Sequence, residues 1–258
     1  MNLKVTVIQS VLYWEEADKN LEHFSGILKT LDATDIIVLP EMFTTAFTMK
    51  PEVLAEEHGG KGLQWMIKCA AEKQCAVTGS ISVKEGSHYY NRLYWVEPSG
   101  TFLSYDKRHL FSMGKEHEHY TPGNQKQIIT YKGWKICPLI CYDLRFPVWS
   151  RNTPQDPYDL LIYVANWPEV RSTAWKQLLM ARAIENQCYV AGVNRIGEDG
   201  NSLPHSGDTL VVSPKGEAIS NIKPNEQAAE TVELCLSDLV EFRDAFPVLN
   251  DGDEFTLS

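Results

Sequence analysis

The chain has 258 residues, of which 43% are hydrophobic and 22% charged, a composition that is ordinary for one large α/β domain or two small ones. Its net charge of −10 argues against general binding to nucleic acid or to anionic membranes, because both need basic surfaces. The six cysteines are scattered and suggest no disulfide framework. No apolar run approaches the ~20 residues of a membrane span, and the start of the chain has the pattern of a strand rather than of a signal peptide. We therefore expect a cytoplasmic protein.

The first half of the chain alternates between strand and helix patterns. Short runs of β-formers predict strands at 3–9, 36–39, 76–83, 89–97 and 101–105, and apolar residues at helical spacing predict helices at 15–31 and 63–73. Pro98-Ser99-Gly100 is typical of a turn, so 92–96 and 101–105 are predicted to form a hairpin. The following segment, 108–124, contains Gly114, Pro122 and Gly123 and is predicted to be a loop.

The second half repeats this mixture of strands and helices. It predicts a hairpin of 128–131 and 134–140, strands at 160–166, 188–194, 209–213, 218–222 and 231–236, and helices at 172–186 and 237–246. Ser172 is expected to cap the helix that follows it. No long linker or repeat divides the chain, so we expect a single domain over 1–258. Two mixed halves of this kind predict two sheets packed together with helices outside.

Three predicted strands end next to a chemically reactive residue. The strand at 36–39 leads to Glu41, the strand at 101–105 leads to Lys107, and the strand at 134–140 leads to Cys141. Each residue also has a structural interpretation: a solvated strand end, a member of a surface charge cluster, or a buried small hydrophobe. The Cys141 thiol lies where α/β proteins hold reactive groups, beyond the carboxyl end of a central strand, but each residue taken alone leaves the structural interpretation open.

Together, these residues would form a nucleophilic site. The thiolate is the reactive form of cysteine, and Glu41 could take the proton of the Cys141 thiol. If the substrate is an amide, Lys107 and the backbone N–H after Cys141 could stabilise the tetrahedral oxyanion. Glu41 could then protonate the departing ammonia and activate the water that hydrolyses the acyl-thioester.

The sequences around these residues resemble the nitrilase, or carbon–nitrogen hydrolase, superfamily. The resemblance rests on Val38-Leu39-Pro40-Glu41-Met42-Phe43, Tyr105-Asp106-Lys107-Arg108-His109-Leu110-Phe111 and Ile140-Cys141-Tyr142-Asp143-Leu144-Arg145-Phe146-Pro147, supported by Tyr163-Val164-Ala165-Asn166-Trp167-Pro168 and by 181–187. It implies a four-layer α-β-β-α sandwich, a Glu41–Lys107–Cys141 triad and a second glutamate that orients Lys107 and the substrate. Glu116 and Glu118 are both candidates for this glutamate. Glu116 is preferred because it lies seven residues before Gly123, where the family pattern places it.

Within the superfamily the chain resembles the omega-amidase branch, whose members release ammonia from 2-oxoglutaramate or 2-oxosuccinamate. Such substrates carry a carboxylate that needs a cation in a closed pocket. Arg145 is the first candidate, with Arg171 and Arg195 as others, although Arg145 could instead form an ion pair with Asp143. The other substrate-binding candidates are Phe43, Tyr142, Asn166 and Trp167, of which the aromatic residues could equally belong to the core.

Several alternatives remain open at this stage. His109, His117 and His119 could each pair with the thiol. His117 and His119 could instead bind a metal, but no third or fourth ligand has suitable spacing, so we expect neither a metal nor a cofactor. A redox pair of Cys137 and Cys141 is excluded because the two would lie roughly 13 Å apart along a strand.

Hydrolases of N-carbamoyl amino acids, aliphatic amides or nitriles share the triad, and a non-catalytic nitrilase-like binding protein is a further alternative. For the amidase we expect a small amide as substrate, no nucleic-acid or membrane partner, and a homodimer formed through 172–186 and 237–258.

Overall fold

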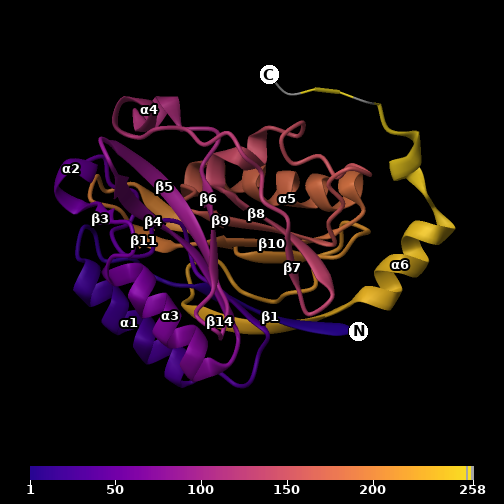
Figure 1. The fold of residues 1–258 in the computed structure, drawn as a ribbon, viewed down its shortest axis with the longest axis horizontal. Helices are drawn as coiled ribbons and strands as arrows, with labels where there is room; N and C mark the ends of the chain where they lie inside the picture. Colours follow the sequence, from indigo (N-terminus) through magenta and orange to yellow (C-terminus); the bar gives the residue numbers. More distant parts are fainter. Residues whose placement is uncertain (254, 257–258) are drawn as a thin grey trace.

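The chain folds into two β-sheets that lie face to face. The computed structural model describes residues 1–253 and 255–256, so the last part of the predicted dimerisation tail, at 254 and 257–258, lies outside the described residues. The first sheet has the order β14-β1-β2-β4-β5-β6, with β3 beside β4, and the second has the order β13-β10-β9-β8-β7 (Figure 1). A small hairpin of β11 and β12 completes the strands.

The elements have the following bounds. The first sheet consists of β1 (Asn2–Gln9), β2 (Ile36–Val38), β3 (Glu56–Glu57), β4 (Ala76–Glu85), β5 (His88–Val96), β6 (Phe102–Asp106) and β14 (Ala228–Cys235). The other strands are β7 (Ile129–Tyr131), β8 (Trp134–Ile140), β9 (Leu160–Ala165), β10 (Tyr189–Asn194), β11 (Ile196–Glu198), β12 (Pro204–Ser206) and β13 (Leu210–Val212). The α-helices are α1 (Ala17–Lys29), α2 (Pro51–Leu54), α3 (Lys61–Lys73), α4 (Glu116–His119), α5 (Ser172–Asn186) and α6 (Leu236–Ala245), and the short 3₁₀ helices are η1 (Ser112–Gly114), η2 (Cys141–Arg145), η3 (Glu169–Arg171) and η4 (Val248–Asp251).

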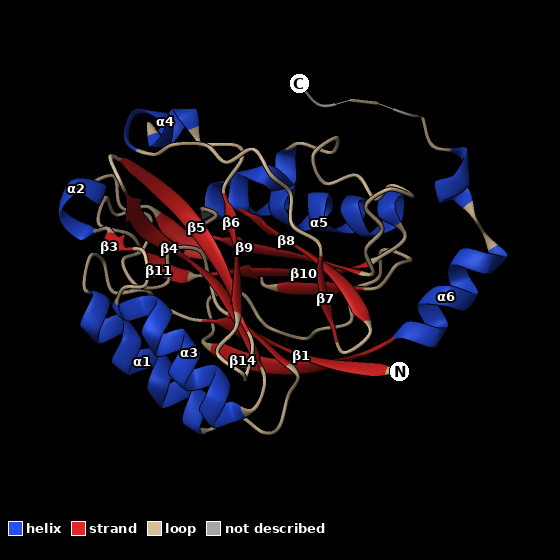
Figure 2. Ribbon diagram, in the orientation of Figure 1, coloured by secondary structure: helices blue, strands red, loops and turns tan. Residues whose placement is uncertain are grey.

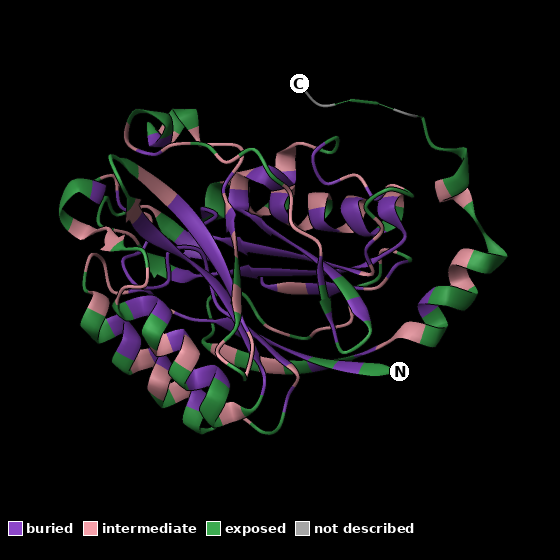
Figure 3. Ribbon diagram, in the orientation of Figure 1, coloured by how far each residue is buried: buried purple, intermediate pink, exposed green. Residues whose placement is uncertain are grey.

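Helices cover the outer faces of both sheets. Helices α1 and α3 lie on the first sheet and α5 lies on the second (Figure 2). Apolar residues at helical spacing explain this placement, since Phe24 of α1, Met66 of α3 and Trp175 of α5 are all fully buried. The central strands β2, β9 and β10 are buried throughout (Figure 3). The predicted α-β-β-α sandwich is therefore confirmed.

The parallel strands at the centre of each sheet determine where the site lies. Strand β2 pairs in parallel with β1 and β4, and β8 pairs in parallel with β9. All three residues of β2, and all residues of β8 except the exposed Lys135, are buried and apolar, as expected for strands covered on both faces. Glu41 follows the carboxyl end of β2 and Cys141 follows that of β8, so the two sheets bring these residues together.

Three local predictions are wrong. Ser172 begins α5 but does not cap it, because its hydroxyl donates a hydrogen bond to Asp208 Oδ2, 2.8 Å away. The stretch 218–222 is not a strand and makes only an isolated bridge through Ala218, because its chain continues into the turns before β14. The segment 108–124 is not entirely loop, since it contains η1 and the single turn of α4.

Among the described residues, no helix has the length and apolar character needed to cross a membrane.

Candidate active site

An ammonium group lies between two carboxylates where the sheets meet. Lys107 Nζ donates hydrogen bonds to Glu41 Oε1 at 2.8 Å and to Glu116 Oε2 at 2.9 Å. Asn91, from β5, joins the same carboxylates, with its Nδ2 at 2.8 Å from Glu41 Oε1 and 3.1 Å from Glu116 Oε1. The side chains of Lys107, Glu41 and Glu116 are completely buried. Buried charges are stable only when they are paired in this way.

The geometry distinguishes the two candidates for the second glutamate. Glu116 is buried and its Oε2 also accepts the backbone N–H of Phe111 at 2.6 Å, which fixes the turn that carries it. Glu118, two residues later, is exposed on α4 and lies beside Lys115 at the surface. Only Glu116 therefore contacts Lys107.

Burial and mutual attraction determine the charge states of this cluster. Burial lowers the pKa of Lys107, but the Glu116 and Glu41 carboxylates outweigh that effect and raise it overall, so the ammonium stays charged. Burial raises the pKa of Glu116, while the Lys107 ammonium opposes the shift. Lys107 therefore supplies a fixed positive charge inside the site.

Cys141 stands at a sharp turn between β8 and η2. Its φ of 43° lies in the left-handed region, which costs on the order of 1–3 kcal/mol for a residue with a side chain. The turn places the thiol within electrostatic reach of the Glu41 carboxylate. Burial and the Glu41 charge raise the pKa of Cys141 well above its ordinary value. The resting residue is therefore a neutral thiol whose proton lies next to a carboxylate.

The buried carboxylate of Asp143 connects the lysine segment to the cysteine segment. Asp143 Oδ2 accepts hydrogen bonds from the Tyr105 hydroxyl at 2.7 Å and from the Ile140 N–H at 3.0 Å. Its Oδ1 accepts the backbone N–H of His109 at 3.0 Å and lies 2.8 Å from His109 Nδ1. Tyr105 and His109 flank Lys107, and Ile140 directly precedes Cys141. The Asp143 side chain therefore ties the segment that carries Lys107 to the segment that carries Cys141.

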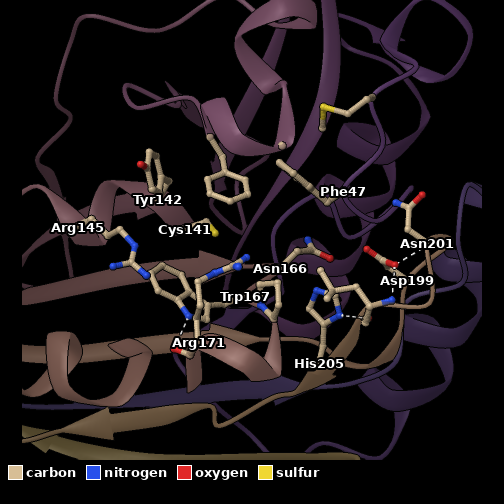
Figure 4. A pocket seen from close by; sticks show the side chains of 15 residues that line it. Phe47, Cys141, Tyr142, Arg145, Asn166, Trp167, Arg171, Asp199, Asn201 and His205 are labelled. Carbon is tan, nitrogen blue, oxygen red and sulfur yellow. Dashed lines mark hydrogen bonds between the residues drawn. The ribbon is translucent and has the colours of Figure 1, made fainter. Parts of the chain in front are cut away.

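Cys141 opens into a small cavity of about 170 Å³. This volume is below the ~300–1,000 Å³ of sites for drug-sized ligands, so it suits a small metabolite. Four predicted substrate-binding residues line it, namely Tyr142, Arg145, Asn166 and Trp167 (Figure 4). The Arg145 guanidinium lies over the Trp167 ring, 4.8 Å from its centroid, and forms no ion pair with Asp143.

The structure contradicts the prediction that Phe43 lines the pocket. Phe43 is fully buried in the core beneath α1 and α3, where its ring contacts Phe24 and Trp65. Phe47, one tight turn later, lines the cavity instead. A left-handed residue directly precedes each of them, Met42 before Phe43 and Ala46 before Phe47, with φ values of 45° and 59°. The Ala46 N–H donates to the Met42 carbonyl at 2.8 Å and closes this turn, which the apolar pattern did not reveal.

The geometry does not support the alternative roles considered for the histidines. His109 contacts Asp143 and stacks on Phe146, with ring centroids 3.8 Å apart, so it is held away from the thiol. His117 is exposed on α4. Within the described part of the chain, no three His, Cys, Asp or Glu side chains group as metal ligands.

Sequence reasoning missed two parts of the site. Asn91 is a polar residue in a buried stretch of β5, and this interruption of the apolar pattern was the available signal. The turn between β11 and β12 contributes Asp199, Asn201 and Leu203 to the cavity wall, although neither strand was predicted. These strands have only three residues each, too few for a periodic pattern.

The fold is that of a carbon–nitrogen hydrolase. The sequence model of that family, described as "Carbon-nitrogen hydrolase", matches residues 4–244, and the chain belongs to this family. The predicted nitrilase-superfamily membership and hydrolase class are thereby confirmed.

Similar proteins agree with this classification. The chain is 46% identical over 257 residues to "Omega-amidase YafV" of Escherichia coli, covering 99% of this chain and 98% of the relative. It is 34% identical to the "2-oxoglutaramate amidase" of Bacillus subtilis, covering 97% and 98%. A solved structure from Xanthomonas campestris, described as a CN-hydrolase superfamily protein with an arsenic adduct in the active site, superposes over 100% of both chains with a TM-score of 0.97 and 39% identity.

Proposed function

We propose that the protein is an omega-amidase that hydrolyses the terminal amide of 2-oxoglutaramate or 2-oxosuccinamate through a thioester on Cys141. The observation that carries the proposal is Arg145, which shares the cavity with the Cys141 thiol and has no ion-pair partner among the described residues. A pocket cation without an internal anion favours a substrate that brings its own carboxylate. The names of the Escherichia coli and Bacillus subtilis relatives support the same substrate class.

Acylation begins with attack of Cys141 Sγ on the amide carbon while Glu41 takes the thiol proton. The tetrahedral oxyanion is stabilised by Lys107 and by the backbone N–H of Tyr142. As the C–N bond breaks, Glu41 returns the proton to the nitrogen and ammonia leaves. Glu116 holds Lys107 in place through the hydrogen bonds described above.

Deacylation uses the same groups in reverse. A water molecule attacks the thioester carbon while Glu41 accepts one of its protons, and the oxyanion again forms at Lys107. The C–S bond breaks, Cys141 recovers its proton from Glu41, and the carboxylic acid product leaves as its anion. No step requires a cofactor or metal.

The remaining predicted residues would orient the substrate. Asn166 is fixed because its N–H donates to Glu41 Oε2 at 2.7 Å and its amide Nδ2 to the Glu41 carbonyl. Its buried Oδ1 has no partner among the described residues and would accept an N–H of the substrate amide. Tyr142 and Trp167 would form the walls, and Arg145 would bind the far carboxylate.

The proposal is tested by ammonia release from 2-oxoglutaramate, N-carbamoyl-β-alanine, propionamide and propionitrile. We expect 2-oxoglutaramate to have the highest kcat/KM, and Arg145→Gln to lower that value by about 10²-fold, since a charge-assisted hydrogen bond contributes roughly 1.5–3 kcal/mol. Propionamide has no carboxylate, so its turnover should change little in the variant.

Other outcomes identify the alternatives. Preferred turnover of the N-carbamoyl compound, the simple amide or the nitrile would replace the omega-amidase proposal by that activity. Absence of turnover for every compound would favour a non-catalytic binding protein.

We also propose that the enzyme is a cytoplasmic homodimer. The predicted interface segments carry exposed apolar side chains, including Ile184 of α5 and Val240 and Phe246 at α6, with exposures of 54%, 47% and 59%. Burial of such side chains against a second copy would be favourable. Sedimentation equilibrium should give twice the chain mass of 29.3 kDa, and a species of 29.3 kDa at micromolar concentration would reject the dimer.

A further inference from the structure

The cavity contains a second arginine that the proposed mechanism does not use. Arg171, from η3, lies over the Phe111 ring at 5.4 Å from its centroid, much as Arg145 lies over Trp167 at 4.8 Å. Both arginines line the cavity that contains Cys141 (Figure 4). Arg92, Arg182 and Arg243 pair with carboxylates, and Arg195 donates to backbone carbonyls. Neither pocket arginine forms an ion pair with any described residue. Aromatic faces therefore hold both guanidiniums, and their N–H donors remain available.

The two guanidiniums are close enough to repel one another. Burial lowers the pKa of Arg171, the neighbouring Arg145 charge lowers it further, and Cys141 acts in the opposite direction. Arg171 is therefore within electrostatic reach of both the second cation and the nucleophile. Two adjacent like charges without an anion are unfavourable, and an anion bound between them relieves the repulsion.

We propose that Arg171 is a specificity-determining residue, which together with Arg145 selects substrates carrying a 2-oxo group and excludes those carrying a 2-ammonium group. This inference rests on the proposed omega-amidase function and specifies how the site recognises the group on carbon 2 of the substrate. A 2-oxo acid presents only acceptor oxygens there, namely two carboxylate oxygens and one ketone oxygen. These oxygens match two guanidiniums, each of which has several donors in a planar fork.

L-Glutamine has the same length and the same terminal amide but carries an ammonium group at carbon 2. That group offers only donors and a positive charge, so it would face two cations. The pocket carboxylate that could balance it is Asp199, and Figure 4 shows Asp199 at the opposite end of the cavity from Arg145. Asp199 Oδ1 already accepts the backbone N–H groups of Asn201 at 2.8 Å and Leu203 at 2.9 Å. Glu41 and Glu116 are engaged with Lys107. The pocket therefore repels the amino acid as well as attracting the oxo acid.

The test measures kcat/KM for 2-oxoglutaramate, L-glutamine and glutaramate, which has only a methylene at carbon 2. The variants are Arg171→Gln, Arg171→Lys and, as a matched control, Lys115→Gln. Lys115 is exposed near the pocket rim and does not line the cavity, so this control removes one positive charge without changing the pocket wall. Thermal unfolding of each variant reports on the fold.

We expect Arg171→Gln to lower kcat/KM for 2-oxoglutaramate by about 10²-fold, to lower that for glutaramate less, and to leave or raise that for L-glutamine. The preference for the oxo acid over the amino acid should therefore fall at least tenfold. Arg171→Lys should keep most of the preference because it keeps the charge, and Lys115→Gln should resemble the wild type.

Two results would overturn the inference while leaving the omega-amidase proposal intact. One is an equal loss for all three substrates in Arg171→Gln, and the other is an unchanged preference in that variant. A wild-type enzyme that releases ammonia from none of the three compounds would contradict the omega-amidase proposal itself. In that case, calorimetric titration of the Cys141→Ala variant with 2-oxoglutaramate and L-glutamine still decides the inference, because equal affinities would exclude selection at carbon 2.

Discussion

Replacement of Cys141 by alanine is expected to lower amide turnover by three or more orders of magnitude without unfolding the protein. The thiol is the nucleophile in the proposed mechanism, and loss of a nucleophile leaves only the residual effect of oxyanion stabilisation and binding. The side chain is small and is 9% exposed at the cavity, so its removal costs little packing. Ammonia release and the urea midpoint of the variant test both parts of this expectation.

Cys137 provides the matched control for this experiment. It lies four residues earlier, within β8, is completely buried and does not line the cavity. Cys137→Ala should therefore lower stability modestly through a small void, while kcat/KM stays within a few-fold of wild type. Turnover retained in Cys141→Ala, or lost equally in Cys137→Ala, would exclude the assignment of the nucleophile.

Replacement of Lys107 by methionine should have the second large effect, and it should reduce both activity and stability. The variant leaves the buried carboxylates of Glu41 and Glu116 without the ammonium that pairs with them. Removal of one partner from a buried ion pair costs about 3–5 kcal/mol. Loss of an oxyanion stabiliser costs about 10²–10³-fold in kcat, and misplacement of Glu41 would add to this loss. Urea denaturation and steady-state kinetics measure the two effects separately.

A double variant separates the structural role of Lys107 from its catalytic role. Lys107→Met with Glu116→Gln removes one of the two uncompensated charges, so it should recover part of the lost stability. Activity should stay as low as in the single variant, because the oxyanion still lacks the ammonium. If the double variant regained activity together with stability, Lys107 would act only through the fold.

The sequence was sufficient to predict the position of the triad because each residue follows a strand. Apolar runs identify β2 and β8 as buried strands, and the carboxyl ends of parallel strands meet where α/β folds bind ligands. Glu41 and Cys141 directly beyond those ends could therefore be expected to converge. The preference for Glu116 over Glu118 came from the family spacing, and the structure places only Glu116 against Lys107.

Features that depend on tertiary contacts could not be predicted in this way. Phe43 and Phe47 are both aromatic residues after β2, and the turn with left-handed residues at Met42 and Ala46 decides which one faces the cavity. Ser172 has the side chain of a helix cap, but Asp208, distant in sequence, takes its hydroxyl. Arg145 and Arg171 are 26 residues apart, and only the folded chain shows that they share one cavity and form no ion pair with the residues that the structure describes.

The central claim is that the substrate acyl group is carried by Cys141 during turnover. The most direct measurement is rapid acid quench during hydrolysis of 2-oxoglutaramate, followed by intact-protein and peptide mass spectrometry. We predict an adduct of the 2-oxoglutaryl group on the peptide that contains Cys141, absent from Cys141→Ala and from enzyme quenched before substrate is added. Steady turnover with no adduct at any quench time, or an adduct on another residue, would contradict the mechanism.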